Sequence, residues 1–159
     1  MLTKNQERQW IIRLYKTETG STEVDMHEVA KFAVKIGWPI PDPIKPFDRL
    51  ATQFSQAARE EIKHDKDTGR PYRVNHAVPM QRSDRRQLYL WVDIDEASRP
   101  LMSKSLVGRR QQIVSDALQL DLDQEHWNNI HPDEEQINLP LDFTDDVEWA
   151  KNAPLDEAI

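Results

Sequence analysis

Two runs of alternating apolar and polar residues, joined by a short basic segment, constrain the fold of this 159-residue chain more than any other feature. Aliphatic residues occupy every second position over residues 88–94, and residues 72–78 alternate in a similar way. A period of two predicts a β-strand with one buried face. Because the segment between the runs is short and polar, we expect an antiparallel hairpin. Pro79 then lies near the end of an edge strand, where its missing N–H does no harm.

Helical periodicity is present on both sides of the predicted hairpin. Apolar residues spaced three and four apart predict helices over residues 4–18, 25–36, 47–64 and 99–120, with a short fifth helix near 123–130. We expect a short extended stretch over residues 21–24. Asp25 and Glu28 have the spacing of a capping box at the start of the second helix. Residues 38–46 contain four prolines within eight positions, which excludes a regular helix between the second and third helices.

This order of elements resembles the winged helix-turn-helix DNA-binding domain over about residues 4–95. The resemblance implies an α+β, mainly helical fold with a three-helix core and a β-hairpin wing, followed by an added long helix. It also implies that the third helix enters the major groove and that the wing contacts the DNA backbone or minor groove. A long helix after the wing often mediates dimerisation in such proteins, so we expect a homodimer through residues 100–120. The long, proline-rich connector differs from the tight turn that the family usually has there.

Charge is divided by position along the chain. Residues 1–110 carry 20 Lys and Arg against 15 Asp and Glu, whereas residues 111–159 carry one basic residue and 13 acidic ones. Basic surfaces attract phosphate backbones, and acidic segments are repelled by them. Periodicity ends near residue 130, so we expect a winged-helix-like domain over residues 1–130 and a disordered acidic tail over residues 131–159. The alternative is an acidic protein whose charges fall unevenly by chance.

Composition also narrows the class of protein. The chain contains no cysteine, which excludes disulfides and thiolate metal sites. The sequence has no apolar run of the roughly 20 residues that span a bilayer, and its first residues lack the apolar core of a secretory signal. We therefore expect a cytoplasmic, soluble protein without a membrane partner.

Two groups of residues are candidates for DNA contact. The hairpin and its surroundings contribute five arginines, whose planar guanidinium groups suit phosphate: Arg70, Arg73, Arg82, Arg85 and Arg86. The third helix contributes polar and basic side chains on one face: Arg49, Gln53, Gln56 and Lys63. The alternative for both groups is an ordinary solvated surface, and Glu60 and Glu61 have the wrong sign for a phosphate contact.

The acidic tail contains one apolar hexapeptide, residues 136–141, with the sequence QINLPL. It resembles the motif by which bacterial proteins bind the replication sliding clamp. The resemblance implies that an extended peptide inserts Leu139 and Leu141 into a pocket, with Ile137 near the rim and the Gln136 amide as an orienting group. The alternative is that the strict alternation of apolar residues over 137–143 docks the tail on its own domain as a strand or clip.

The sequence does not predict catalysis. The four glycines are isolated, which excludes a glycine-rich phosphate loop. The segment around His76 faintly resembles the core of HNH-type nucleases but lacks the expected partners, so we expect His76 to be a half-buried strand residue. Clustered carboxylates attract hard cations, so Asp93, Asp95 and Glu96 leave a metal-dependent nuclease as an alternative. We otherwise expect no metal and no cofactor.

These observations lead to a functional hypothesis. We expect a non-catalytic DNA-binding protein of bacterial type whose tail recruits a partner, plausibly the sliding clamp, in replication, repair or the maintenance of a mobile element. The alternative from another class is a protein–protein adaptor or inhibitor whose acidic tail mimics DNA or masks the basic face.

Overall fold

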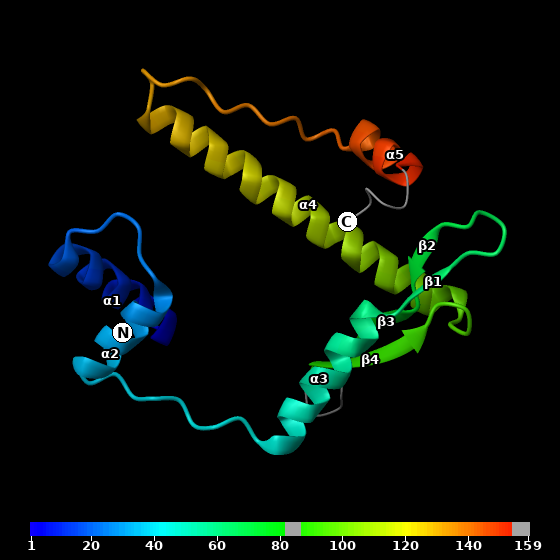
Figure 1. Ribbon diagram of the computed structural model, residues 1–159, viewed down its shortest axis with the longest axis horizontal. Coiled ribbons are helices and arrows are strands. Elements are labelled where there is room, and N and C mark those ends of the chain that lie inside the picture. Colours follow the sequence, from blue (N-terminus) through cyan, green and yellow to red (C-terminus); the bar gives the residue numbers. More distant parts are fainter. Residues whose placement is uncertain (82–86, 154–159) are drawn as a thin grey trace. The chain divides into compact units, whose positions relative to one another are not determined.

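The structure is a computed structural model that describes residues 1–81 and 87–153, with the backbone alone for residues 87 and 88, and its fold is α+β (Figure 1). The helices in these ranges are α1 (Lys4–Thr19), α2 (Met26–Lys35), α3 (Pro46–Glu60), α4 (Arg99–Ile130) and α5 (Thr144–Asn152). The strands are β1 (Ile62–His64), β2 (Pro71–Arg73), β3 (Asn75–Gln81) and β4 (Gln87–Asp93). Contacts divide the chain into two compact units, Met1–Arg49 and Leu50–Ile159, and each is described by itself.

In the first unit, α1 and α2 pack around a small apolar core. Its buried side chains are Ile11, Val29 and Ala33, and partly buried apolar residues surround them. Among these, the rings of Tyr15 and Phe32 meet edge to face with their centroids 5.5 Å apart. The apolar stripes that predicted the two helices from the sequence are therefore the surfaces that hold them together.

The start of α2 confirms Asp25 as the N-cap but not the predicted capping box, which would join Asp25 to the N–H of Glu28. Asp25 caps the helix, because its carboxylate accepts the backbone N–H two residues ahead at 2.7 Å. Glu28 was predicted to complete a capping box. Its carboxylate instead accepts a hydrogen bond from Lys31 Nζ at 2.6 Å, and this bond raises the pKa of Lys31.

In the second unit, β3 and β4 form the predicted antiparallel hairpin, with all seven residues of each strand paired in register. Alternation along β3 places His76 and Val78 on one face, where both are buried. Val78 and the adjoining Val74 keep only 1% and 2% of their exposure. The hairpin therefore forms the core of this unit.

On the buried face of the hairpin, the first turns of α4 cross β3. Ser105 Oγ lies 3.3 Å from His76 Nδ1, and both residues are buried. Lys104 Nζ donates a hydrogen bond to the carbonyl of Pro79 at 2.7 Å. Both contacts are polar and specific, so they define where α4 lies along β3.

On the other face of the hairpin, the end of α3 is anchored by one amide and one cation–π contact. Asn75 Nδ2 donates to the carbonyl of Ala58 at 3.2 Å and to Glu61 Oε2 at 2.7 Å. The guanidinium of Arg59 lies 5.4 Å from the centre of the Trp91 ring, a favourable cation–π distance. The hairpin is thus contacted by α3 on one face and α4 on the other.

The prediction of a third helix through residue 64 was wrong. The helix ends at residue 60, and Ile62–His64 pair with Pro71–Arg73 as a second small hairpin. The turn between these strands supplies the reason. Asp65 Oδ1 accepts from the backbone N–H of Thr68 at 2.8 Å and from its hydroxyl at 3.0 Å, which lowers the pKa of Asp65. Gly69 completes the turn with a positive φ of 68°.

Residues 72–78 were predicted as one strand, but they belong to two. The chain changes partner at Val74, whose N–H donates to the carbonyl of Glu61 at 3.1 Å and whose carbonyl accepts from Ile94 at 2.8 Å. Periodicity within the run gives no sign of this change, because both parts keep the same alternation. Residues 21–24, expected to be extended, belong to no strand.

The long helix continues where two helices were predicted. A short fifth helix was expected to begin near residue 123, but the Asp123 carboxylate accepts a hydrogen bond from Gln119 Nε2 at 2.8 Å within an unbroken α4. This helix of 32 residues, like the others in the described ranges, is not apolar enough to cross a membrane.

Two glycines offer a matched test of the backbone. Gly69→Ala is expected to destabilise the protein by about 1 kcal/mol, because alanine is strained at a φ of 68°. Gly108→Ala is expected to stabilise it by up to about 1 kcal/mol, because Gly108 lies inside α4 and an added Cβ would meet no atom within 4 Å. Urea unfolding of both variants and the wild type gives the two free energies. Shifts of the same sign would contradict these backbone assignments.

Candidate nucleic-acid interface and the C-terminal segment

The candidate contacts on the third helix are exposed side chains of α3. Gln53 and Gln56 are three residues apart and therefore share one side of the helix. The Gln56 amide donates to Glu60 Oε1 at 3.3 Å. Arg49 is also exposed and is the last residue of the first unit. In the part of α3 that belongs to the second unit, the candidate side chains are therefore two amides, with the Glu60 carboxylate beside them.

The candidates Lys63 and Arg73 lie on the small β1–β2 sheet, but on opposite faces. Lys63 is opposite Tyr72 in the strand pairing, whereas Arg73 is opposite Ile62. Directly opposed residues share a face, and successive residues alternate between faces. The two cations therefore do not gather on one side of this sheet.

Arg70, in the turn between β1 and β2, contacts the C-terminal segment. Its Nη2 donates to Asn152 Oδ1 at 3.3 Å. Nearby, a hydrogen bond from Lys151 lowers the pKa of Glu148, and the charge of Arg70 contributes to the same shift. One arginine predicted to bind phosphate therefore contacts the last residue of α5.

The wing candidates Arg82, Arg85 and Arg86 lie outside the described residues. On either side of them, the pairing of β3 and β4 extends to Gln81 and Gln87. The sequence that carries the three arginines therefore joins two paired strand ends, as the alternation predicted.

The carboxylates at the end of β4 have other partners than a metal ion. Asp93 Oδ1 accepts the backbone N–H of Asp95 at 2.8 Å, and Asp95 Oδ2 accepts the hydroxyl of Tyr72 at 3.0 Å. The bond to Asp95 raises the pKa of Tyr72. Within residues 1–81 and 87–153, no three His, Asp or Glu side chains are grouped so that they could hold a metal ion. The nuclease alternative therefore has no assembled site in this part of the chain.

His76 is a buried strand residue with both ring nitrogens engaged. Nε2 lies 3.1 Å from the carbonyl oxygen of Arg73, and Nδ1 lies 3.3 Å from Ser105 Oγ. A neutral imidazole protonated on Nε2 donates to the carbonyl and accepts the serine hydroxyl on Nδ1. The predicted strand position of His76 is confirmed, and its contacts connect β3 to α4.

The hexapeptide, residues 136–141, lies along α4 and is held through its backbone. Asn128 forms two hydrogen bonds with Ile137, from Nδ2 to the carbonyl at 2.8 Å and from the backbone N–H to Oδ1 at 2.9 Å. Gln124 Oε1 accepts the backbone N–H of Leu139 at 3.0 Å. Gln124 and Asn128 are one helical turn apart, so their amides meet alternate residues of an extended peptide.

These hydrogen bonds leave the apolar side chains of the hexapeptide accessible. Ile137, Leu139 and Leu141 keep 41%, 49% and 40% of their exposure. The tail thus docks on its own chain through backbone bonds and does not bury the side chains that the clamp-binding motif would use.

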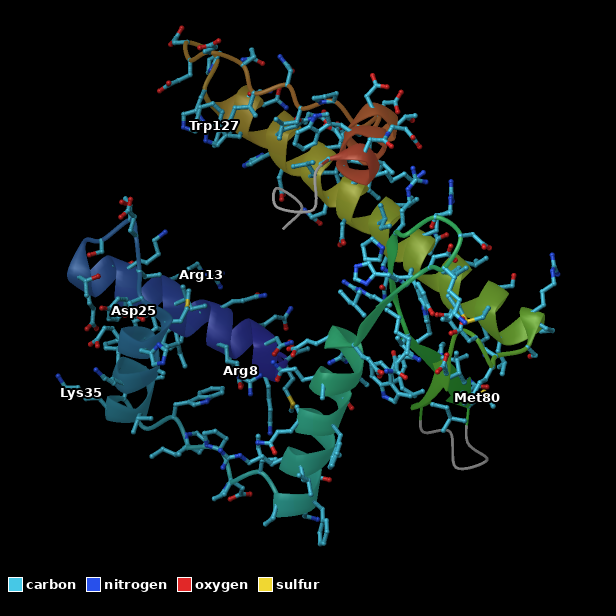
Figure 2. The ribbon with its side chains drawn as sticks, turned by 45° about the vertical axis from the view of Figure 1, so that its right-hand side comes forward. Arg8, Arg13, Asp25, Lys35, Met80 and Trp127 are labelled. Carbon is cyan, nitrogen blue, oxygen red and sulfur yellow. The ribbon has the colours of Figure 1, made fainter. Side chains whose placement is uncertain are left out.

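The tail contains more structure than its composition predicted. The segment before α5 is turned by Asp142, whose carboxylate accepts the Thr144 hydroxyl at 2.7 Å and its backbone N–H at 3.1 Å, and this lowers the pKa of Asp142. Trp127 lies at the far end of α4 (Figure 2). Its ring stacks on His131 with the ring centroids 4.2 Å apart. Disorder over residues 131–159 was predicted because periodicity ends near residue 130 and acidic residues dominate, with docking of residues 137–143 on the chain's own domain as the alternative. Neither the end of periodicity nor acidity reports hydrogen-bond partners on α4.

Three residues with clear structural roles were missed from the sequence. Arg59 was not among the candidate residues, although its guanidinium lies over the Trp91 ring. Gln124 and Asn128 were not singled out, although they hold the hexapeptide. Their signal was an amide pair four residues apart on a helix that precedes an alternating peptide.

Two parts of the described chain are candidate binding surfaces. One is the end of the β3–β4 hairpin that leads to the wing arginines, and the other is the hexapeptide on α4. Comparison with protein-family models, curated proteins and solved structures finds no match to this chain.

Proposed function

We propose that this protein binds duplex DNA without catalysis, with the β3–β4 hairpin as a wing and α3 beside it, and that its C-terminal segment recruits a protein partner. The observation that carries the proposal is the pairing of β3 with β4 up to Gln81 and Gln87. This pairing makes the five-residue segment with Arg82, Arg85 and Arg86 the connection of a hairpin. Arginines on such a connection suit the phosphate backbone, because each guanidinium can donate two parallel hydrogen bonds.

A winged-helix arrangement is part of the proposal. It is supported by the order of elements and by an apolar stripe on α3 that includes Phe47, Leu50 and Phe54. These side chains are exposed, although their spacing of three and four residues is typical of a core-facing helix. In winged-helix domains such a stripe packs against the first two helices.

The two acidic residues at the end of α3 are compatible with this role. Glu61 accepts the amide of Asn75 at 2.7 Å, and Glu60 accepts that of Gln56 at 3.3 Å. Both carboxylates are thus engaged by neighbouring amides. Their charges remain, so phosphate contact is assigned to the hairpin connection and not to the end of the helix.

Titration of the full chain with a fluorescently labelled duplex tests the proposal. Log affinity is expected to fall linearly with log salt, with a slope of about −0.9 for each phosphate neutralised. Duplexes of unrelated sequence are expected to bind within a few fold of one another, because phosphate contacts carry no base information. Absence of binding at a low salt concentration by the folded protein would end the proposal.

For the partner of the C-terminal segment we propose the bacterial sliding clamp, on the basis of residues 136–141. The apolar side chains of this hexapeptide are accessible, whereas its backbone is bonded to Asn128 and Gln124. A clamp that takes up the peptide in extended form competes with α4 for these backbone groups. The docked state therefore lowers the affinity for the clamp and does not prevent binding.

Asn128→Ala is expected to tighten binding to the sliding clamp by up to about thirtyfold, because two backbone hydrogen bonds no longer hold Ile137 and each contributes about 1 kcal/mol or less. The neighbouring Asn129→Ala is the matched control and is expected to leave affinity unchanged. Surface plasmon resonance with immobilised clamp measures both. Failure of Leu139→Ala with Leu141→Ala to weaken binding, or no binding by any variant, would exclude the clamp as the partner.

One observation favours the alternative of a self-masking tail. Arg70 donates to Asn152, and Glu148 lies close enough to sense its charge. Tighter DNA binding after neutralisation of Asp145, Asp146 and Glu148 to their amides would support masking. Unchanged DNA binding would exclude masking and leave binding of a protein partner as the role of the C-terminal segment.

A further inference from the structure

The long helix α4 carries several exposed apolar side chains. Beyond its first turns, which contact β3, the helix carries a row of exposed aliphatic side chains. Val107, Val114, Leu118 and Leu122 keep 62%, 43%, 58% and 49% of their exposure. Gln111 separates Val107 from the other three, and exposed apolar side chains gathered on one side of a helix often mark a protein interface.

This row does not coincide with the side of α4 that holds the tail. At about 100° per residue, Val107, Val114 and Leu118 lie within roughly 40° of one another around the helix. Of the two residues that hold the tail, Gln124 lies roughly 80° to 120° and Asn128 roughly 40° to 80° away from them around the helix. The row is therefore free to contact another molecule while the hexapeptide stays docked on its own chain.

The distribution of charge along α4 indicates which molecule binds this row of side chains. The first part of the helix, residues 99–110, carries four basic residues and no acidic ones: Arg99, Lys104, Arg109 and Arg110. The remainder, residues 111–130, carries four acidic residues and no Lys or Arg: Asp116, Asp121, Asp123 and Glu125. The helix is thus complementary to its own reverse, because an antiparallel copy places each basic part opposite an acidic part.

From this pattern we infer that the exposed row of α4 binds the α4 of a second copy of the chain, antiparallel and around a twofold axis near Val114 and Ser115. In this register Val107 of one copy meets Leu122 of the other, and Lys104 faces Glu125. A parallel pair would bring like charges together along the whole helix, which is unfavourable. A twofold pair is also the commonest symmetry of soluble homo-oligomers.

The inference goes beyond the proposed DNA binding and does not depend on it. The earlier expectation of a dimer through residues 100–120 came from resemblance and set no orientation. The charge pattern sets an antiparallel orientation and extends the interface to Leu122 and Glu125. A dimer built in this way presents two copies of every surface on the second unit, including both hexapeptides.

Sedimentation equilibrium of the full chain tests the dimer. The wild type is expected at twice its monomer mass of 18.7 kDa. Val114→Glu combined with Leu118→Glu is expected to raise the dimer dissociation constant by at least about a hundredfold, because two carboxylates per chain replace apolar contacts. Gln112→Glu adds a charge on the opposite side of α4 and is expected to change nothing. A monomeric wild type over the whole accessible concentration range overturns the inference.

Thiol cross-linking tests the orientation without disturbing the helix charges, because the chain contains no cysteine of its own. In the antiparallel pair the two Val107 positions are about 22 Å apart along the axis, whereas Val107 and Leu122 are opposite each other. A mixture of Val107→Cys and Leu122→Cys chains is expected to form the mixed cross-linked dimer with a short bismaleimide. Val107→Cys alone is expected to form none. Efficient cross-linking of Val107→Cys to itself overturns the antiparallel arrangement.

Discussion

Simultaneous replacement of Arg82, Arg85 and Arg86 by alanine is expected to weaken duplex DNA binding by about one to two orders of magnitude at low salt. The three residues join the paired ends of β3 and β4, so they act as one group on a hairpin connection. Each phosphate contact contributes about 0.9 to the slope of log affinity against log salt, so loss of three contacts flattens the slope by about 2.7. The loss is expected to be equal for all sequences. Fluorescence anisotropy over a range of salt concentrations measures the affinity and the slope together.

A control with the same change in net charge separates the wing from a general electrostatic effect. Arg13, Lys16 and Lys35 are exposed on α1 and α2, and the first and last of them are labelled in Figure 2. Their triple alanine variant also removes three positive charges. It is expected to weaken binding by less than about threefold, because these three residues carry none of the proposed phosphate contacts and an exposed charge without a direct contact is screened. Equal losses in both variants would contradict the assignment of the wing, and circular dichroism confirms that each variant is folded.

Val78→Ala is expected to destabilise the second unit by about 2 kcal/mol, because it removes two buried methyl groups and leaves a cavity between β3 and α4. Val78 keeps 1% of its exposure and lies on the hairpin face that α4 covers. Leu90 is directly opposite Val78 in the strand pairing, yet keeps 44% of its exposure. Leu90→Ala removes more atoms, but it is expected to cost less than about 1 kcal/mol.

The comparison of these two variants tests the position of α4 on the hairpin. Urea unfolding at a fixed protein concentration, followed by circular dichroism, gives both free energies. Hydrogen exchange of the β3 and β4 amides shows whether the loss falls on the second unit. A larger cost for Leu90→Ala than for Val78→Ala would mean that another surface, and not α4, covers this part of the hairpin.

Local patterns predicted much of the secondary structure correctly. The hairpin followed from a period of two in residues 72–78 and 88–94, because side chains of a strand alternate between faces whatever lies beyond them. The first two helices and the cap at Asp25 followed from interactions within a few residues of the chain. Each of these features has its cause inside a short window, and the window is visible in the sequence.

The errors occurred where a distant partner outweighed local preference. Residues 62–64 continue a helical pattern, but they pair with residues 71–73 once Asp65 and Gly69 close the turn. The acidic tail lacks helical periodicity and was expected to be disordered, with docking on its own domain as the alternative, but Asn128 and Gln124 bind its backbone. Strand pairing and hydrogen bonds from side-chain amides stabilise these conformations only after the chain has folded back, so local sequence preferences do not predict them.

The sequence by itself determined the alternating hairpin, the helical segments, the basic connection between β3 and β4, and the reversal of charge along α4. These features depend on residue order, periodicity and formal charge, which the unfolded chain already has. Only the tertiary structure decided that Val74 is where the chain exchanges one strand partner for another and that His76 bonds to Ser105. It alone also decided that α4 holds residues 136–141 on one side and leaves its aliphatic row open on another. Such contacts join residues far apart in the chain, and their free energy appears only when hydrogen-bonding groups and apolar surfaces meet in space.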